Sequence, residues 1–209
     1  MALARPPVVA LVSAWLMLVA PSIVNAQTLP TGAYTFNRAA SAVGFTISAS
    51  MIFKVKENGT FNDFTGSLSY DPARPADTHV DLTVYTGSVD THNSEHDQML
   101  KSPDFFDVER FPTMHFVSAS TFTKPDGTLS MTGDMTIRGV TKRMTIPVAL
   151  RRDSAANDQS GAVFESTFQI DRTEFGLNGV PDWHGFHVSI SKKVEIHIAI
   201  ATRPGPPLP

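Results

Sequence analysis

Apolar and polar residues alternate with a period of two along much of this chain. In segment 128–137, hydrophobic residues and Gly133 take every second position, and threonine, serine or aspartate takes most positions between them. This alternation is typical of a β-strand that buries one face. The same pattern predicts further strands at 43–48, 80–85, 114–122, 140–150 and 194–200, with additional candidates at 34–36, 59–70 and 162–172.

Turn-forming residues separate these segments. Asp71-Pro72, Pro125-Asp-Gly127 and Arg138-Gly139 are turn sequences, and Asn58-Gly59 is expected to form a hairpin turn because it readily adopts positive φ. About eight antiparallel strands, each apolar on one face, predict a closed barrel or a sandwich. An eight-stranded barrel is just wide enough to hold one small ligand.

The hydrophobic composition leaves two interpretations of the interior open. The chain has 14 phenylalanines and 8 methionines. Methionine fills irregular space, so methionine beside phenylalanine suits a pocket that adapts to an apolar ligand. The same residues could simply fill a solid core.

The N-terminal segment resembles a secretory signal. Arg5 precedes an apolar run of about a dozen residues, and Val24-Asn25-Ala26 is a small-residue cleavage sequence. We therefore expect a cleaved signal peptide at 1–26, secretion, and one domain at 27–202. Residues 203–209 are proline-rich and are expected to form an exposed tail.

Composition argues against several functions. The chain contains no cysteine, so disulfides, thiolate metal sites and cysteine nucleophiles are absent. The formal net charge of −3 and the lack of a long basic run argue against a nucleic-acid partner. No nucleophile elbow, phosphate loop or His-Glu-x-x-His motif occurs, so no catalytic residues are assigned and the chain is not expected to be an enzyme, although an uncharacterised enzyme on the same barrel is kept as the least favoured alternative.

One segment has the spacing of a metal-binding helix. His92 and His96 are four residues apart. However, Ser94-Glu-His-Asp97 has the form of a capping box, which predicts Ser94 as the N-cap of a helix from Glu95 to Lys101 that ends near Ser102, before Pro103. His92 then lies outside the helix, so no metal site is assigned, and a metal bound by His92 and His96 is kept as the weaker alternative.

Five motifs resemble the YceI-like family, the bacterial periplasmic proteins that bind polyisoprenoids. They occur in the order of the family and extend from about Tyr34 to Ala201. The motifs are Tyr34-Thr-Phe36 with Ser41-Ala-Val-Gly-Phe45, Gly59-Thr-Phe-Asn-Asp-Phe-Thr-Gly66, Ser102-Pro-Asp-Phe-Phe-Asp-Val-Glu-Arg-Phe-Pro112, Gly133-Asp-Met-Thr-Ile-Arg-Gly-Val-Thr-Lys142 and Ile170-Asp-Arg-Thr-Glu-Phe-Gly-Leu177.

The resemblance implies a lipocalin-like, eight-stranded antiparallel barrel with a short helix near 94–101 and an apolar tunnel. It also implies a carrier or storage protein for a polyprenol or quinone tail, pairing as a homodimer, and contact with a membrane that is at most transient. No cofactor besides the bound lipid is expected. The chain departs from the family at His96 and Met99, where relatives commonly carry arginine and then histidine.

The expected ligand contacts are inward-facing wall residues and aromatic residues at the barrel ends. The wall candidates are Phe45, Ile47, Leu82, Val84, Phe116, Met131, Met135, Met144 and Phe168, and the end candidates are Phe105, Phe106, Phe175 and Trp183. The end residues could equally be plain structural caps.

Overall fold

The computed structural model describes residues 32–50, 54–71, 73–152, 161–179, 182–183, 186–187 and 189–204. The expected signal peptide lies outside the described residues, as do positions 205–209 and the side chain of Trp183.

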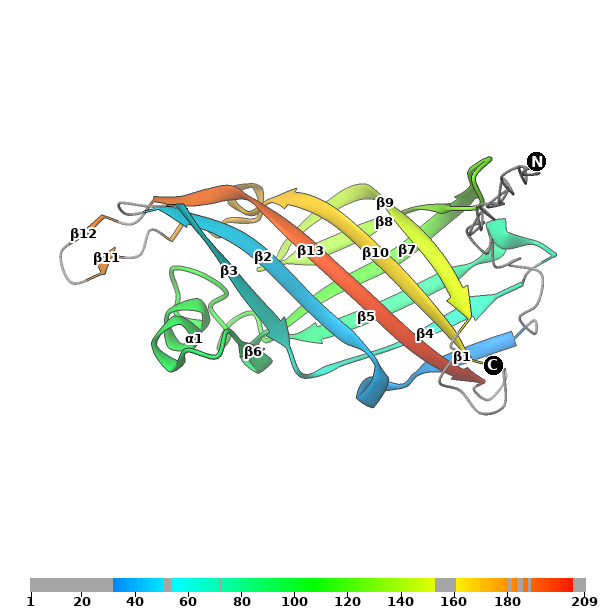
Figure 1. Ribbon diagram of the computed structural model, residues 1–209, viewed down its shortest axis with the longest axis horizontal. Coiled ribbons are helices and arrows are strands. Elements are labelled where there is room, and N and C mark those ends of the chain that lie inside the picture. The colour runs from blue at the N-terminus through cyan, green and yellow to red at the C-terminus, as the bar shows by residue number, and fades with distance from the viewer. Residues whose placement is uncertain are drawn as a thin grey trace, which may run out of the picture.

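Thirteen strands, one α-helix and four short 3-10 helices, at Arg38–Ala40, Pro75–Asp77, Thr86–Ser88 and Arg172–Phe175, make up the regular structure of these residues (Figure 1). In chain order the strands and the α-helix are β1 (Gly32–Phe36), β2 (Ala42–Ser50), β3 (Lys54–Phe61), β4 (Phe64–Tyr70), β5 (His79–Tyr85), β6 (Val89–Asp90), α1 (Ser94–Lys101), β7 (Thr113–Thr123), β8 (Leu129–Ile137), β9 (Val140–Arg152), β10 (Ala162–Asp171), β11 (Asp182–Trp183), β12 (Phe186–His187) and β13 (Ser189–Pro204).

Eight of the strands close into an antiparallel barrel. Hydrogen bonds join them in the order β1-β4-β5-β7-β8-β9-β10-β13, and β1 pairs with β13 to close the ring. The predicted eight-stranded barrel is therefore confirmed over the alternative of a sandwich. β2 pairs with the first part of β13, whereas β1 pairs with the last part of the same edge. β3 pairs with β2, and β6 pairs with β3.

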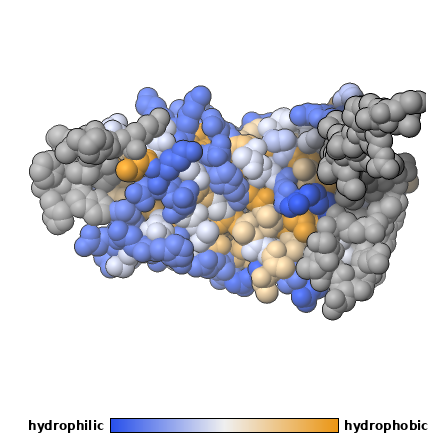
Figure 2. Space-filling model, viewed as in Figure 1, coloured by the Kyte–Doolittle hydropathy of each residue, from blue (hydrophilic) through white to orange (hydrophobic). Residues whose placement is uncertain are grey.

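The inward faces of the strands form the core. In β8, buried and half-buried residues alternate without exception from Leu129 to Ile137, as the sequence predicts. Figure 2 shows the outer surface on the side viewed, where hydrophilic residues gather over the left and centre and apolar residues show through right of centre. The barrel is thus apolar inside because each strand directs alternate side chains to opposite faces.

Gly59 corrects the prediction of a hairpin turn at Asn58-Gly59. The residue lies within β3, opposite Phe45 of β2. A Cβ atom on Gly59 would lie 2.4 Å from Cζ of Phe45. The glycine therefore leaves space for the Phe45 ring and does not form a turn. The predicted strand at 59–70 is instead divided at Asn62 and Asp63, between β3 and β4.

The start of α1 differs by one residue from the prediction. The N-cap is Asn93, whose side chain accepts hydrogen bonds from the backbone N–H groups of Glu95 and His96. Asp97 does not complete a capping box but accepts hydrogen bonds from the N–H and hydroxyl of Thr91, at 2.8 and 2.7 Å. The predicted helix end at Ser102 is confirmed.

The predicted tail begins later than expected. β13 extends to Pro204, which pairs with Tyr34 of β1. Arg203 and Pro204 therefore belong to the seam that closes the barrel.

Candidate functional site

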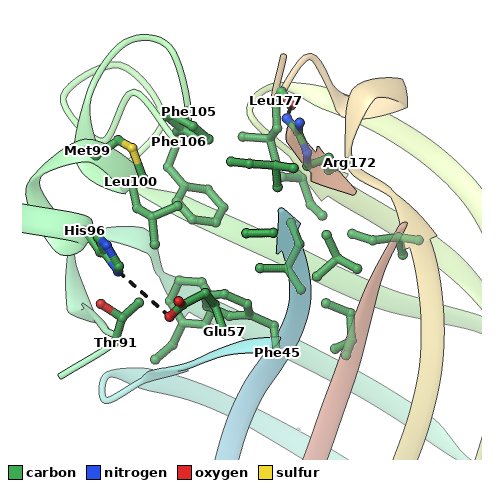
Figure 3. Close-up of a pocket in the computed structure, with 18 of the residues that line it drawn as sticks. Phe45, Glu57, Thr91, His96, Met99, Leu100, Phe105, Phe106, Arg172 and Leu177 are labelled. Carbon is green, nitrogen blue, oxygen red and sulfur yellow. Dashed lines mark hydrogen bonds and ion pairs between the residues drawn. The ribbon is translucent and has the colours of Figure 1, made fainter. Parts of the chain in front are cut away.

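A cavity of about 480 Å³ opens at the α1 end of the barrel (Figure 3). This volume lies within the range of about 300–1,000 Å³ that is usual for small-ligand pockets. Its walls come from β2, β3, α1, the loop after α1, the end of β10 and the start of β13. The lining residues are Phe45, Ile47, Ala49, Ser50, Val55, Glu57, Phe61, Thr91, His96, Met99, Leu100, Phe105, Phe106, Met114, Ile137, Ile170, Arg172, Leu177, Ile190, Val194 and Ile196.

The cavity exists because β3 is not covered by a strand along most of its length. β3 pairs with β2 on one side, but on the other side it pairs with β6 only at Thr60 and Phe61. α1 lies across this gap, and none of its residues is buried. His96, Met99 and Leu100 share the helix face at i, i+3 and i+4 and face the cavity.

Three aromatic rings form one wall of the cavity. The centroids of Phe45 and Phe61 are 5.8 Å apart, and those of Phe61 and Phe106 are 5.6 Å apart with nearly perpendicular planes. These separations are typical of favourable aromatic pairs. The wall therefore connects β2 and β3 to the loop that follows α1.

The loop after α1 closes one end of the cavity. Phe105 is buried, and its ring lies against Gly179, where a Cβ atom would be 2.5 Å from it. The N–H of Gly179 donates to the carbonyl of Asp104 at 3.0 Å, and Arg138 donates to the carbonyls of Pro103 and Gly176. These hydrogen bonds join the loop to the β8–β9 turn and to segment 172–179, and so they determine where Phe105 lies.

Arg172 is the buried cation of the site. Only 6% of the residue is exposed, and its guanidinium group donates to the carbonyls of Ser191, Leu177 and Gly179. Burial lowers the pKa of Arg172 below its ordinary value, and the nearby charge of Asp171 opposes that shift. Arg172 thus holds the 172–179 segment against the start of β13.

Glu57 and His96 are the other ionisable side chains at the cavity. Nδ1 of His96 lies 3.9 Å from Oε2 of Glu57, and Figure 3 shows the two groups facing one another across the space between α1 and β3. The His96 side chain is 19% exposed and that of Glu57 is 41% exposed. Glu57 and His96 are therefore the ionisable groups of the partly open side, whereas Arg172 is buried.

Two smaller pockets of about 60 Å³ each continue the interior away from α1. The nearer pocket, here called the first, has five lining residues in common with the large cavity, namely Phe61, Met114, Ile137, Ile170 and Ile196. The second shares Leu82, Phe116, Met135 and Ile198 with the first. The shared walls place the three spaces in series, although the interior is much narrower beyond the large cavity.

The structure distributes the predicted contact residues among these spaces. Phe45, Ile47, Phe105 and Phe106 line the large cavity, whereas Leu82, Val84, Phe116, Met131, Met135 and Phe168 line the smaller pockets. Met144 and Phe175 pack with the core and line none of these three spaces. Trp183 falls outside the described side chains.

Several cavity residues were missed by the sequence analysis, notably Glu57, Met99, Leu100 and Arg172. The helical spacing of Met99 and Leu100 with His96 was a signal that could have identified that wall. The inward position of Glu57 could have been found by extending the alternation of β3 from Phe61 back to Val55.

The two histidines considered as metal ligands lie in different environments. His92 precedes the helix at a positive φ of 60°, and its Nδ1 is 3.3 Å from Asp90. His96 faces Glu57 instead. Within the described part of the chain, no group of three or more histidine, aspartate or glutamate residues could hold a metal ion.

Of the helices in the described ranges, none has the length and apolar character needed to cross a membrane.

Comparison with known proteins identifies relatives of the whole barrel. The family model described as YceI-like domain matches residues 34–202. A UPF0312 protein of Vibrio parahaemolyticus is 33% identical over 169 residues, which is 77% of this chain and 87% of the relative. A UPF0312 protein of Pseudomonas putida is 34% identical over 125 residues, and that match spans 64% of the relative's length.

Solved structures share the fold at low sequence identity. Burkholderia cenocepacia BcnA has a TM-score of 0.68 and 23% identity, with 79% of this chain and 98% of BcnA covered. A polyisoprenoid binding domain from Saccharophagus degradans, implicated in plant cell wall breakdown, has a TM-score of 0.65 and 14% identity, with 83% of this chain and 99% of that chain covered.

Proposed function

The chain belongs to the YceI-like domain family, and we propose that it binds an isoprenoid-type lipid in the cavity beneath α1. The observation that carries the proposal is the cavity of about 480 Å³, whose lining is mostly apolar. A polyisoprenoid binding domain from Saccharophagus degradans has the same fold, which supports this proposal.

Burial of hydrocarbon supplies the free energy of binding. Each CH₂ group removed from water contributes roughly 0.8 kcal/mol, so one five-carbon isoprene unit contributes at most roughly 4 kcal/mol. Immobilising the ligand opposes this gain. Two or three buried units are therefore enough for firm binding without polar contacts along the chain.

The series of pockets suggests how a longer chain is held. A first segment fills the large cavity, and the remainder extends past Met114 and Met135 into the two smaller spaces. Methionine side chains change rotamer readily, so they can yield as the chain enters. Chains longer than the large cavity then bind at the cost of rearranging this part of the core.

The proposed role is that of a carrier or storage protein in the periplasm for a polyprenol or a quinone tail. The signal-like N-terminus at 1–26 supports export, and the apolar cavity supports binding rather than catalysis. A homodimer and transient contact with a membrane stay predictions from the family resemblance.

The test is to purify the protein from its native compartment, extract it with organic solvent and identify the extract by mass spectrometry. We expect an isoprenoid at close to one molecule per binding site. The emptied protein should then bind farnesol in an isothermal titration. If no lipid is recovered and the emptied protein binds no prenol, the proposal is refuted.

A further inference from the structure

We infer that Glu57 and His96 form a head-group site that selects an isoprenoid alcohol over an acceptor-only or phosphorylated head. This inference rests on the proposed function, because it specifies the ligand of the same cavity. Its basis is the placement of one carboxylate and one imidazole facing one another in a wall that is mostly apolar.

Glu57 occupies an inward-facing position of β3, where the alternation along the strand predicts an apolar residue. Val55 and Phe61 share its face and line the same cavity. Opposite them on β2, Glu57 pairs with Ile47, and Val55 pairs with Ala49. A carboxylate among these neighbours loses part of its hydration, which is unfavourable unless another polar group compensates.

His96 approaches the carboxylate from α1. The separation of 3.9 Å between Nδ1 and Oε2 is longer than a hydrogen bond, so the two groups face one another without a direct hydrogen bond between these atoms (Figure 3). A hydroxyl oxygen that lies beside the line joining the two atoms, about 2.8 Å from each, can bond both. It donates its proton to Glu57 and accepts a hydrogen bond from His96.

Glu57 needs a hydrogen-bond donor on the ligand, and this requirement distinguishes between possible head groups. A carboxylate oxygen only accepts, so it needs an O–H or N–H on the ligand. A quinone carbonyl or an ether cannot supply one. An alcohol meets both requirements of the pair, with its oxygen at the polar edge and its chain directed into the apolar cavity.

Charge disfavours a phosphorylated head. Glu57 repels an anion at this position. The Nε and Nη1 donors of Arg172, the buried cation of the cavity, already bond the carbonyls of Ser191, Leu177 and Gly179, so these donors are not available to bond a phosphate. The geometry therefore favours an uncharged hydroxyl.

The experiment compares three ligands with one chain: farnesol, farnesyl methyl ether and farnesyl phosphate. Each is titrated into the delipidated full-length protein and into Glu57→Leu, Glu57→Gln and Glu95→Leu. Glu95 is an exposed acid on α1 and serves as the matched control. Circular dichroism melts establish that the variants are folded.

The wild type should bind farnesol about tenfold more tightly than the ether, as expected for one hydrogen bond to a charged group. Glu57→Leu should abolish this preference without weakening ether binding, and Glu57→Gln, which keeps an acceptor oxygen, should retain part of it. Glu95→Leu should leave the preference unchanged.

The outcomes distinguish this inference from the proposed function. Tight binding of all three ligands without a head-group preference, or a preference that survives Glu57→Leu, overturns the alcohol site but upholds lipid binding. Tighter binding of the phosphate than of farnesol also overturns the alcohol site. Failure of the wild type to bind any of the three overturns both.

Discussion

Replacing Gly59 with alanine tests whether a single missing side chain keeps the cavity open. The new Cβ atom would lie 2.4 Å from Cζ and 2.6 Å from Cε1 of Phe45. Ordinary contacts begin near 3.4 Å, so the ring must move by roughly 1 Å. Phe45 lines the cavity and pairs with Phe61, so the movement reduces the cavity and disturbs that aromatic pair.

The expected magnitude follows from two opposing effects. Overpacking of a core costs about 1–3 kcal/mol, whereas replacing a strand glycine by alanine returns about 0.5–1 kcal/mol. We expect a net loss of about 1 kcal/mol, which lowers the melting temperature by about 2–4 °C for a domain of this size. Affinity for farnesol should also fall, because the displaced ring occupies ligand volume.

Gly87→Ala is the matched control. Nothing lies within 4 Å of a Cβ atom at Gly87, and its φ is not in the left-handed region. Its melting temperature should stay the same or rise slightly. The measurements are thermal melts by circular dichroism and isothermal titration with farnesol.

A second substitution makes the test specific to the ring. In the Gly59→Ala background, Phe45→Leu should cost less stability than in the wild type, because the smaller side chain relieves the clash. Equal melting temperatures for Gly59→Ala and Gly87→Ala, or strictly additive effects with Phe45→Leu, would refute the reasoning.

Three further predictions concern the mouth of the cavity, the helix cap and acid stability. Ala49→Trp should fill the cavity and weaken farnesol binding at least about tenfold in a titration, whereas Ala149→Trp, at an exposed position of β9, should not. Asn93→Ala should lower the melting temperature by about 2–4 °C through loss of the cap, and Ser94→Ala should change it by less than about 2 °C; the reverse order would contradict the assigned cap. The hydroxyl of Thr173 is the main cause that lowers the pKa of Asp171 below its ordinary value of 3.8, so the stability from this carboxylate is complete above pH 3.8 and is lost as the pH falls below it. Denaturant unfolding at several acidic pH values should therefore show a smaller loss for Asp171→Asn than for the wild type, and equal losses would contradict this cause.

Strand positions were predictable because their signal is local. A side chain in a strand points to one face or the other, so a buried face appears directly as alternation. β5, β7, β8 and β10 were located within a few residues on this basis. The helix end was also local, because Pro103 disfavours helical geometry at Ser102.

Two local signals led to wrong details. Asn58-Gly59 has the composition of a turn, but Phe45 on the neighbouring strand requires the space above Gly59. Ser94 and Asn93 are both suitable helix caps, and the choice depended on the path by which the chain leaves β6 and enters α1. In each case a contact with another segment decided between two locally acceptable outcomes.

The sequence by itself determined that the protein has alternating strands and an apolar interior, and its motifs indicated the family. The alternation of apolar and polar residues indicates which side chains point inward, but it does not indicate which of them meet across the barrel. Only the closed strand order showed that Phe116, Met131 and Met135 border a small space, whereas α1 and the uncovered edge of β3 leave a cavity of about 480 Å³. The pairing of His96 with Glu57 depends on the same closure, because residues 39 positions apart meet only when the helix crosses that edge.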